Sequence, residues 1–198
     1  MMSESDLREA ERKTYLSYFE DGIADIAGGL TILLFGLGMV FESSSLFIFS
    51  WLPIILFWPL KQAITYPRMG YVKFGPERQR RISRSMILMF LAGTLSLLLG
   101  IVAFLGFEGA VFDLRDFMME YSPLLFGTLM AMAFALIAVL FEVRRFFGYA
   151  ALTFGAWLSA YLFDIEPGPP VALAGGAIVL TGFALLISFL IKHPIPSE

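Results

Sequence analysis

Long apolar runs alternate with short polar segments along the whole chain, and this pattern sets the expected fold. A bilayer core of roughly 30 Å needs about 20 mostly apolar residues in a helix. Six runs meet this requirement, at about 22–41, 45–65, 84–106, 122–141, 146–163 and 170–191. Composition agrees, since 58% of the residues are hydrophobic and 16% are charged, against about 25% in soluble domains. The sequence therefore predicts an all-α polytopic membrane protein, one domain (1–198) built as a bundle of six transmembrane helices.

Lysine and arginine fall on one side of the predicted spans. Of the 14 basic residues, all except Arg115 precede the first span, follow the last, or lie at the facing ends of spans two and three or four and five. The positive-inside rule then places both termini in the cytoplasm and predicts a multi-pass protein of the cell membrane. The polar segment 1–21 has mixed charges and leads directly into the first apolar run. We therefore expect a cytoplasmic N-terminal segment rather than a signal peptide.

Two proline-containing sequences are typical of helix starts. Ser122-Pro123 looks like an N-cap followed by proline at the first helical position, and would open span four. Pro169 and Pro170 would open span six in the same way. Between spans three and four, the segment 107–121 places apolar residues on one helical face, which predicts an interfacial helix on the outer surface.

Span two carries two prolines, Pro53 and Pro59, each of which should bend the helix. Kinked helices often border cavities, although a bend that serves only packing is commoner. Hydroxyl side chains such as Thr31, Ser50 and Thr153 lie within the spans and can bond back to their own helix. A path for an uncharged solute therefore stays open as an alternative.

Pairs of glycines recur at a spacing of seven residues, close to two helical turns, so each pair lies on one face. Glycine at such positions lets helix backbones approach closely, which is how helices associate in lipid. A substrate path lined by exposed carbonyls is the second interpretation. The sequences around the pairs resemble one another, and both an internal repeat and chance similarity remain open. The pairs are Gly29 and Gly36, Gly93 and Gly100, and Gly175 and Gly182.

Few residues suited to catalysis are present. The chain has no cysteine and a single histidine, His193, so thiol chemistry and two-histidine metal sites are excluded within one chain. Neither HExxH nor GxSxG occurs, and no span carries an ionisable residue at its middle. The sequence therefore predicts a protein that is not an enzyme and that binds no cofactor and no metal ion.

Two carboxylates lie at the cytoplasmic start of span one. Asp21 and Asp25 are four residues apart and share a helical face. The helix dipole accounts for Asp21, whereas Asp25 lies a turn deeper and needs a partner. Lys61, at the cytoplasmic end of span two, is the candidate for a structural ion pair with Asp25. A cation or substrate site is the alternative. Glu142, beside Arg144 and Arg145, is likewise interpreted as a member of a structural ion pair.

The loop 66–83 is the strongest electrostatic feature of the chain. Anionic lipid headgroups would attract it by about 1 kcal/mol per basic residue near the surface. Pro67 to Gly70 has the composition of a turn. The loop is either a simple positive-inside anchor or a docking surface for lipid headgroups or a partner. Nucleic acid is not an expected partner, because the chain has a net charge of −3. The candidate binding residues are Tyr66, Arg68, Tyr71, Lys73, Arg78, Arg80, Arg81 and Arg84.

Two stretches, TYPRMGYVKF (65–74) and YFEDGIADIAGGL (18–30), resemble a family of prokaryotic multi-span integral membrane proteins of unknown function. The resemblance covers the first two spans and the loop after them. It implies a membrane protein of the prokaryotic inner or plasma membrane and carries over no activity or catalytic residue.

Two functional hypotheses follow. The first is a non-enzymatic membrane component whose basic loop docks anionic lipid or a partner subunit. It depends on that loop and on the absence of charge at the middle of the spans. The second is a small oligomeric transporter or channel for an uncharged or weakly charged solute. A homo-oligomer is compatible with both hypotheses.

Overall fold

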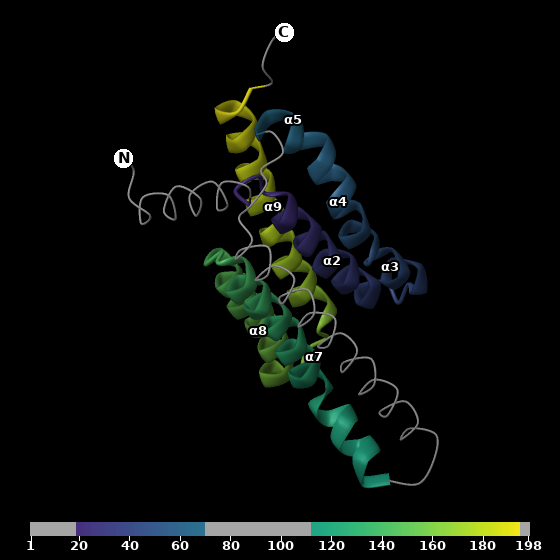
Figure 1. The fold of residues 1–198 in the computed structure, drawn as a ribbon. Coiled ribbons are helices and arrows are strands. Elements are labelled where there is room, and N and C mark those ends of the chain that lie inside the picture. The colour runs from purple at the N-terminus through teal and green to yellow at the C-terminus, as the bar shows by residue number, and fades with distance from the viewer. Residues whose placement is uncertain (1–18, 70–111, 195–198) are drawn as a thin grey trace, which may run out of the picture.

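A computed structural model describes residues 19–69 and 112–194, and every regular element within these ranges is a helix (Figure 1). The first range contains α2 (Ile23–Val40), α3 (Ser44–Phe49), α4 (Leu52–Ile64) and α5 (Tyr66–Met69). The second contains α7 (Phe112–Phe141), α8 (Arg145–Phe163) and α9 (Gly168–Lys192).

Five stretches of helix in the described residues are long and apolar enough to cross a membrane. The structure is thus that of an all-helical protein suited to a multi-pass arrangement. The predicted span 84–106 and most of the basic loop lie outside the described residues. The five stretches are Ile23–Val40, Ser44–Met69, Glu120–Phe141, Arg145–Phe163 and Gly168–Lys192.

The start of span four differs from the prediction. Helix α7 begins at Phe112 and runs without a break through Ser122, so that Pro123 lies inside it. The predicted helix start at Ser122-Pro123 is therefore wrong, and residues 112–121 are continuous with α7, whose stretch suited to crossing a membrane is Glu120–Phe141. Proline removes one backbone donor, a loss that helices in lipid tolerate when the freed carbonyl finds another partner. At the predicted start of span six, Pro169 does lie in the first turn of α9.

The segment 44–69, which includes the predicted span two, is divided into three short helices. Pro53 lies in the first turn of α4, and its ring excludes a helical carbonyl four residues earlier, at Phe49, where α3 ends. Pro59 lies inside α4. The turn predicted for Pro67 to Gly70 is wrong for its first three residues, which belong to α5. Proline fits there because the first turn of a helix has no use for its missing N–H group.

Helices α2 and α9 form the tightest contact of the described bundle, and they run antiparallel (Figure 1). A Cβ atom added to Gly175 of α9 would lie 2.6 Å from the Cα atom of Leu33. One added to Gly36 of α2 would lie 2.7 Å from the Cα atom of Ala172. Gly29 and Gly182 meet the partner backbone equally closely. The glycine face of α2 therefore packs directly on the glycine face of α9, while Gly93 and Gly100 lie outside the described residues.

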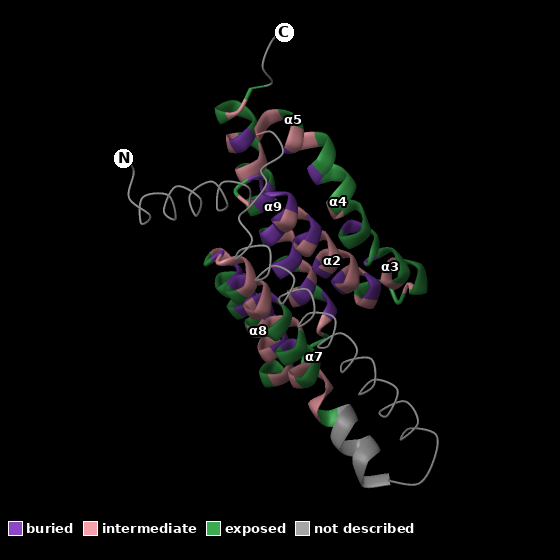
Figure 2. Cartoon of the chain, viewed as in Figure 1, coloured by how far each residue is buried: buried purple, intermediate pink, exposed green. Residues whose placement is uncertain are grey.

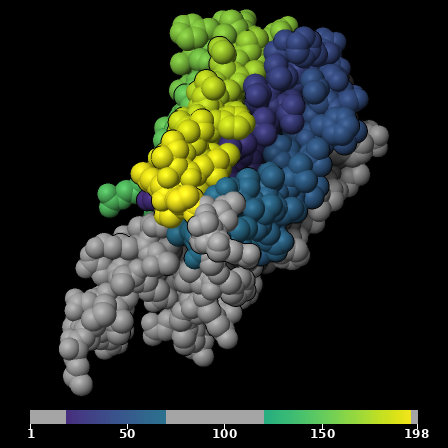
Figure 3. Space-filling view, turned by 90° about the horizontal axis from the view of Figure 1, so that it is seen from above, coloured from purple at the N-terminus to yellow at the C-terminus, as the bar shows by residue number. Residues whose placement is uncertain are grey.

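The remaining helices surround this pair. Helix α7 packs on α8, α8 packs on α9, and α3 and α4 cover the other side of α2. Seen from above, α2 is visible as a strip between α9 and the α3–α5 segment (Figure 3). The core lies where α2, α7, α8 and α9 meet, and includes Phe146, Trp157 and Ile178. Helices α3 and α4 expose most of their surface (Figure 2), including the apolar side chains of Ile55 and Trp58.

Three helices end in the same way. An acidic, left-handed residue lies one or two positions after each end: Glu42 has φ 48°, Glu142 φ 57° and Asp164 φ 50°. In each case the next N–H bonds to a carbonyl five residues back, which defines a Schellman motif. Glycine is the usual residue here, because a side chain in this conformation costs about 1–2 kcal/mol. These helix ends were not predicted from the sequence.

Candidate functional site

Two fully buried carboxylates lie at the start of α2, Asp21 just before the helix and Asp25 in its first turn. Asp21 accepts a hydrogen bond from the backbone N–H of Ile23 at 3.1 Å through Oδ1, which closes the start of the helix. Gly22 adopts a left-handed conformation with φ 71°. A Cβ atom at this position would collide with the carbonyl oxygen of Gly182 in α9, so only glycine lets the chain enter α2 here. One turn further along, Asp25 is 0% exposed, as is Asp21.

Asp21 is linked to the end of α4. The Nζ atom of Lys61 lies 3.1 Å from Oδ2 of Asp21, and the hydroxyl of Thr65 donates a hydrogen bond to the same oxygen at 2.6 Å. Lys61 is only 1% exposed. Its ammonium group also lies 4.3 Å from the ring centroid of Phe19, where the face of the ring attracts a cation. The carboxylate and the ring are the neighbours that compensate the ammonium group in this buried site.

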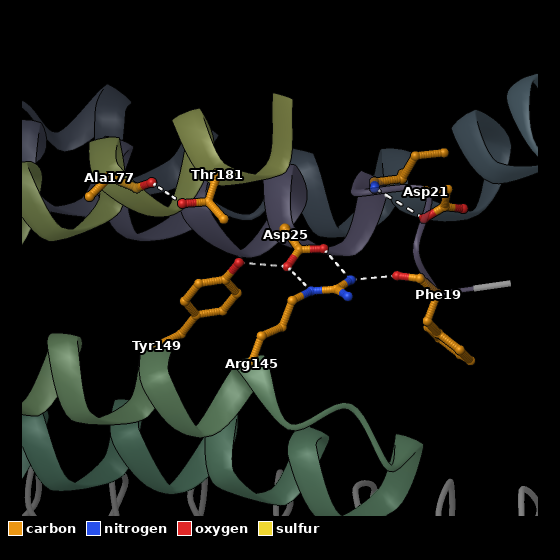
Figure 4. Close-up of polar contacts among 8 residues, drawn as sticks. Phe19, Asp21, Asp25, Arg145, Tyr149, Ala177 and Thr181 are labelled. Atoms are coloured by element: carbon orange, nitrogen blue, oxygen red, sulfur yellow. Dashed lines mark hydrogen bonds and ion pairs between the residues drawn. The ribbon is translucent and has the colours of Figure 1, made fainter. Parts of the chain in front are cut away.

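Asp25 is linked to the start of α8 (Figure 4). Arg145 donates from Nε to Oδ1 at 2.6 Å and from Nη2 to Oδ2 at 2.7 Å, which is the bidentate geometry of a strong charged pair. The hydroxyl of Tyr149 donates to Oδ1 at 2.8 Å. Arg145 also donates to the carbonyl oxygen of Phe19. The arginine side chain is 25% exposed, whereas the carboxylate is wholly enclosed.

The predicted pairing of Asp25 with Lys61 is therefore corrected. Lys61 pairs with Asp21, and Asp25 pairs with Arg145. The physical reason is that α4 and α8 contact the start of α2 at different positions, so each acid receives its base from a different helix. Sequence reasoning missed Arg145 and Tyr149. The available signal was that Arg145 is the last charged residue before span five, as Lys61 is the last before the end of span two.

The resulting network joins three helices through two compensated pairs. Removing one member would leave an uncompensated buried charge, which costs about 3–5 kcal/mol. Both carboxylates are saturated by neighbours, so the arrangement holds helices in place and offers no open coordination position. Within the part of the chain that the structure describes, no group of three or more histidine, aspartate or glutamate side chains could hold a metal ion.

Several serine and threonine hydroxyls within the spans bond to their own helices. Five of them donate to a carbonyl three or four residues earlier, at distances of 2.7 to 3.0 Å. Figure 4 shows one of these bonds, from Thr181 to the carbonyl of Ala177. Such bonds satisfy the hydroxyls without any polar partner from another helix. The five donors are Thr31, Ser50, Thr153, Ser159 and Thr181.

The basic segment, residues 66–84, begins with α5. Tyr66 contacts the ring of Trp58 edge-to-face, with centroids 6.3 Å apart. Arg68 donates from Nη1 to the carbonyl of Ile64 at 2.8 Å. Its Nε atom is buried and has no hydrogen-bond partner among the described residues. Six further candidate residues of this segment lie outside the described residues: Tyr71, Lys73, Arg78, Arg80, Arg81 and Arg84.

Two apolar grooves run between the helices. The first, of about 290 Å³, separates α2 from α4, and α2 contributes Ile23, Ile26, Ala27, Leu30 and Leu34 to it. The second, of about 380 Å³, lies between α7 and α8, and its only polar lining residue is Thr128. Neither groove offers the polar groups that would orient a hydrophilic solute.

The chain was compared with protein-family models, with curated proteins and with solved structures, and no match was found in any of the three. The functional interpretation therefore depends on the geometry of the helices and on the sequence that joins them.

Proposed function

We propose that this protein is a non-enzymatic integral membrane component that docks anionic lipid headgroups through the basic segment 66–84. The observation that carries the proposal is the distribution of basic side chains. Within the ranges whose side chains the structure describes, all five lysines and arginines lie at one end of the bundle, where α2 begins and α9 ends. These residues are Lys61, Arg68, Arg144, Arg145 and Lys192.

The buried network explains which of these charges are available. Lys61 and Arg145 are neutralised by the two aspartates of α2 and do not contribute to an external surface. Arg68, in contrast, begins the run of six basic residues that continues to Arg84. A surface of this kind attracts anionic lipids and weakens as salt screens it. The locally bonded hydroxyls and the apolar grooves favour this function over a solute path.

We propose further that the chain crosses the membrane six times, with both termini and the basic segment in the cytoplasm. The grouping of the described basic side chains at one end supports this orientation. Because the chain has no cysteine, single cysteines at Ser197 and Ala110 would report sidedness directly. A membrane-impermeant maleimide added to intact cells should label A110C and leave S197C unlabelled, and the reverse pattern would refute the orientation.

Native mass spectrometry of protein extracted gently with its own lipids tests the docking proposal. The wild type should carry anionic lipid, and the triple variant Arg78→Gln, Arg80→Gln, Arg81→Gln should lose it. The matched control changes Arg8, Arg12 and Lys13 to Gln, which removes the same charge before span one and should leave the bound lipid in place. A lipid-poor homo-oligomer, or a retained protein subunit with unchanged lipid in the triple variant, would overturn the proposal.

A further inference from the structure

We infer that the groove between α2 and α4 is a lipid site, which takes one acyl chain of an anionic glycerophospholipid and places the phosphate at Arg68. The inference deepens the proposed function and depends on it for the identity of the leaflet. It gives the basic segment one defined lipid site, at its first arginine.

The length of the groove fits one leaflet. Its lining on α2 extends from Ile23 to Leu34, which is roughly 16 Å of helix at about 1.5 Å per residue. Half of a bilayer core roughly 30 Å thick is about 15 Å. A chain that enters at the start of α2 therefore reaches the bilayer midplane where the groove ends.

Helix α3 lies at the end of the groove farthest from α5 and contributes Phe49 to its lining. Helix α3 turns back against α2 there, and the ring of Phe47 packs on that of Phe35 with centroids 5.2 Å apart. Gly38 provides the space, since a Cβ atom at this position would lie 3.2 Å from the Phe47 ring. This contact fixes α3, and with it Phe49, against α2 at the end of the groove that is farthest from α5.

The walls of the groove are suited to hydrocarbon and open toward lipid. The α4 wall consists of Leu52, Pro53, Leu56 and Leu60, and Phe49 of α3 completes the lining. The three leucines remain 43–44% exposed, so a chain can enter sideways from the bilayer. No lining residue is polar, so headgroup selectivity has to come from outside the groove.

Arg68 provides that selectivity at the mouth. Arg68 follows Lys61 by seven residues and Thr65 by three, so it shares with them the helical face that meets the start of α2, where the groove begins. The backbone at Thr65 stays right-handed helical, with φ −83° and ψ −44°, so this face continues from α4 into α5. The guanidinium group donates back to the carbonyl of Ile64, and its buried Nε lacks a partner among the described residues. A phosphate oxygen is the acceptor that best completes such a group.

The test uses the full chain in detergent with added phosphatidylglycerol or phosphatidylcholine, measured by native mass spectrometry. Leu56→Trp fills the groove and should abolish one phosphatidylglycerol site. Ile55→Trp, on the outer face of the same helix, should leave it intact. Arg68→Gln should weaken phosphatidylglycerol binding roughly 10-fold and leave phosphatidylcholine unchanged, since a charged hydrogen bond is lost. Lys192→Gln removes a charge at the same end of the bundle and should have no effect.

The outcomes separate this inference from the proposed function. If Leu56→Trp keeps the lipid while the Arg78, Arg80 and Arg81 triple variant loses it, the groove is refuted and the proposed function stands. If Leu56→Trp and Arg68→Gln lose lipid while the triple variant keeps it, the groove stands and docking by the rest of the basic segment is refuted. Equal loss of both lipids in Arg68→Gln would refute the role of Arg68.

A second measurement needs no variant and covers the case in which Leu56→Trp does not fold. Phosphatidylglycerol with a diazirine near the end of one acyl chain should crosslink the wild type at the end of the groove farthest from Arg68, around Leu34 and Phe49. Excess phosphatidylglycerol should compete, and phosphatidylcholine should not. Crosslinks spread evenly over the outer faces of the helices would overturn the inference.

Discussion

Gly175 gives the sharpest test of the packing, because its neighbour in sequence provides the control. A Cβ atom at Gly175 would lie 2.6 Å from the Cα atom of Leu33, whereas ordinary contact begins at 3.4 Å. The obstacle is the backbone of α2, so no side-chain rotation relieves the clash. At Gly176 an added Cβ atom meets nothing within 4 Å.

The magnitude of the Gly175→Ala effect follows from the required movement. Helices α2 and α9 must separate locally by at least the difference between 2.6 and 3.4 Å, about 0.8 Å, because the backbone N atom of Leu33 lies closer still. A gap of about 0.5–1 Å forfeits a quarter to a half of the dispersion energy of the affected contacts. We expect the free energy of unfolding to fall by about 2–3 kcal/mol, near the upper end for overpacked sites. Gly176→Ala should be neutral or stabilise by up to about 1 kcal/mol, because alanine favours the helix.

Unfolding in mixed micelles, followed by the fluorescence of the three tryptophans, measures both variants under identical conditions. On the scale of about 2–4 °C per kcal/mol for a chain of this size, Gly175→Ala should lower the Tm by roughly 4–12 °C. Equal Tm values for the two variants would show that α2 and α9 do not approach as closely as the structure requires.

Three further predictions use the same unfolding assay. Asp25→Leu should lower the free energy of unfolding by about 3 kcal/mol, the lower end for a broken buried pair, because Arg145 is partly exposed. Adding Arg145→Met to Asp25→Leu should restore most of this stability. Equal losses in the single and the double variant would contradict the pairing. Thr65→Val keeps the side-chain shape but removes the donor to Asp21, so stability should fall by about 1.5–3 kcal/mol, and an unchanged Tm would argue against that bond. Glu42→Gly should raise stability by about 1 kcal/mol, because glycine adopts a left-handed conformation without strain, and a lower Tm would refute this explanation.

The spans were predictable where apolar length alone decides the structure. The predicted span 22–41 corresponds to α2, and 146–163 and 170–191 correspond to α8 and α9 within two residues at each end. The predicted helix boundary was wrong at a proline. Ser122-Pro123 has the composition of a helix start, but the helix already formed by the preceding residues continues through it. Local composition identifies a possible start and cannot report that an upstream helix has made it unnecessary.

The glycine spacing identified which face of each helix would approach another backbone. It did not identify the partner, because small residues at a spacing of two turns fit any similar face. That the first and last described spans pack together is a property of the whole bundle. Their residues lie more than a hundred positions apart in sequence, and apolar composition carries no information on which helix is adjacent to which.

The wrong prediction of the Asp25–Lys61 pair has the same cause, since the sequence does not report which helices are adjacent. Burial of Asp25 near the membrane interface predicted a basic partner, and the requirement for a partner was physically sound. Depth alone pointed to Lys61, since it ignores the position of the helices around α2. Because α4 approaches the first acid and α8 the second, each base reaches the acid on its own side.

The contacts of Lys61 and Thr65 with Asp21 determine where the basic segment starts. Lys61 and Thr65 fix the end of α4 to the first turn of α2, and α5 with Arg68 follows directly. The start of the basic segment is therefore held at a defined position above the α2–α4 groove. A basic segment that only oriented the chain would need charge on the correct side and no such attachment. Two compensated charges buried at the base of the segment favour a surface whose position matters, which is the requirement for holding a headgroup in register with its acyl chain.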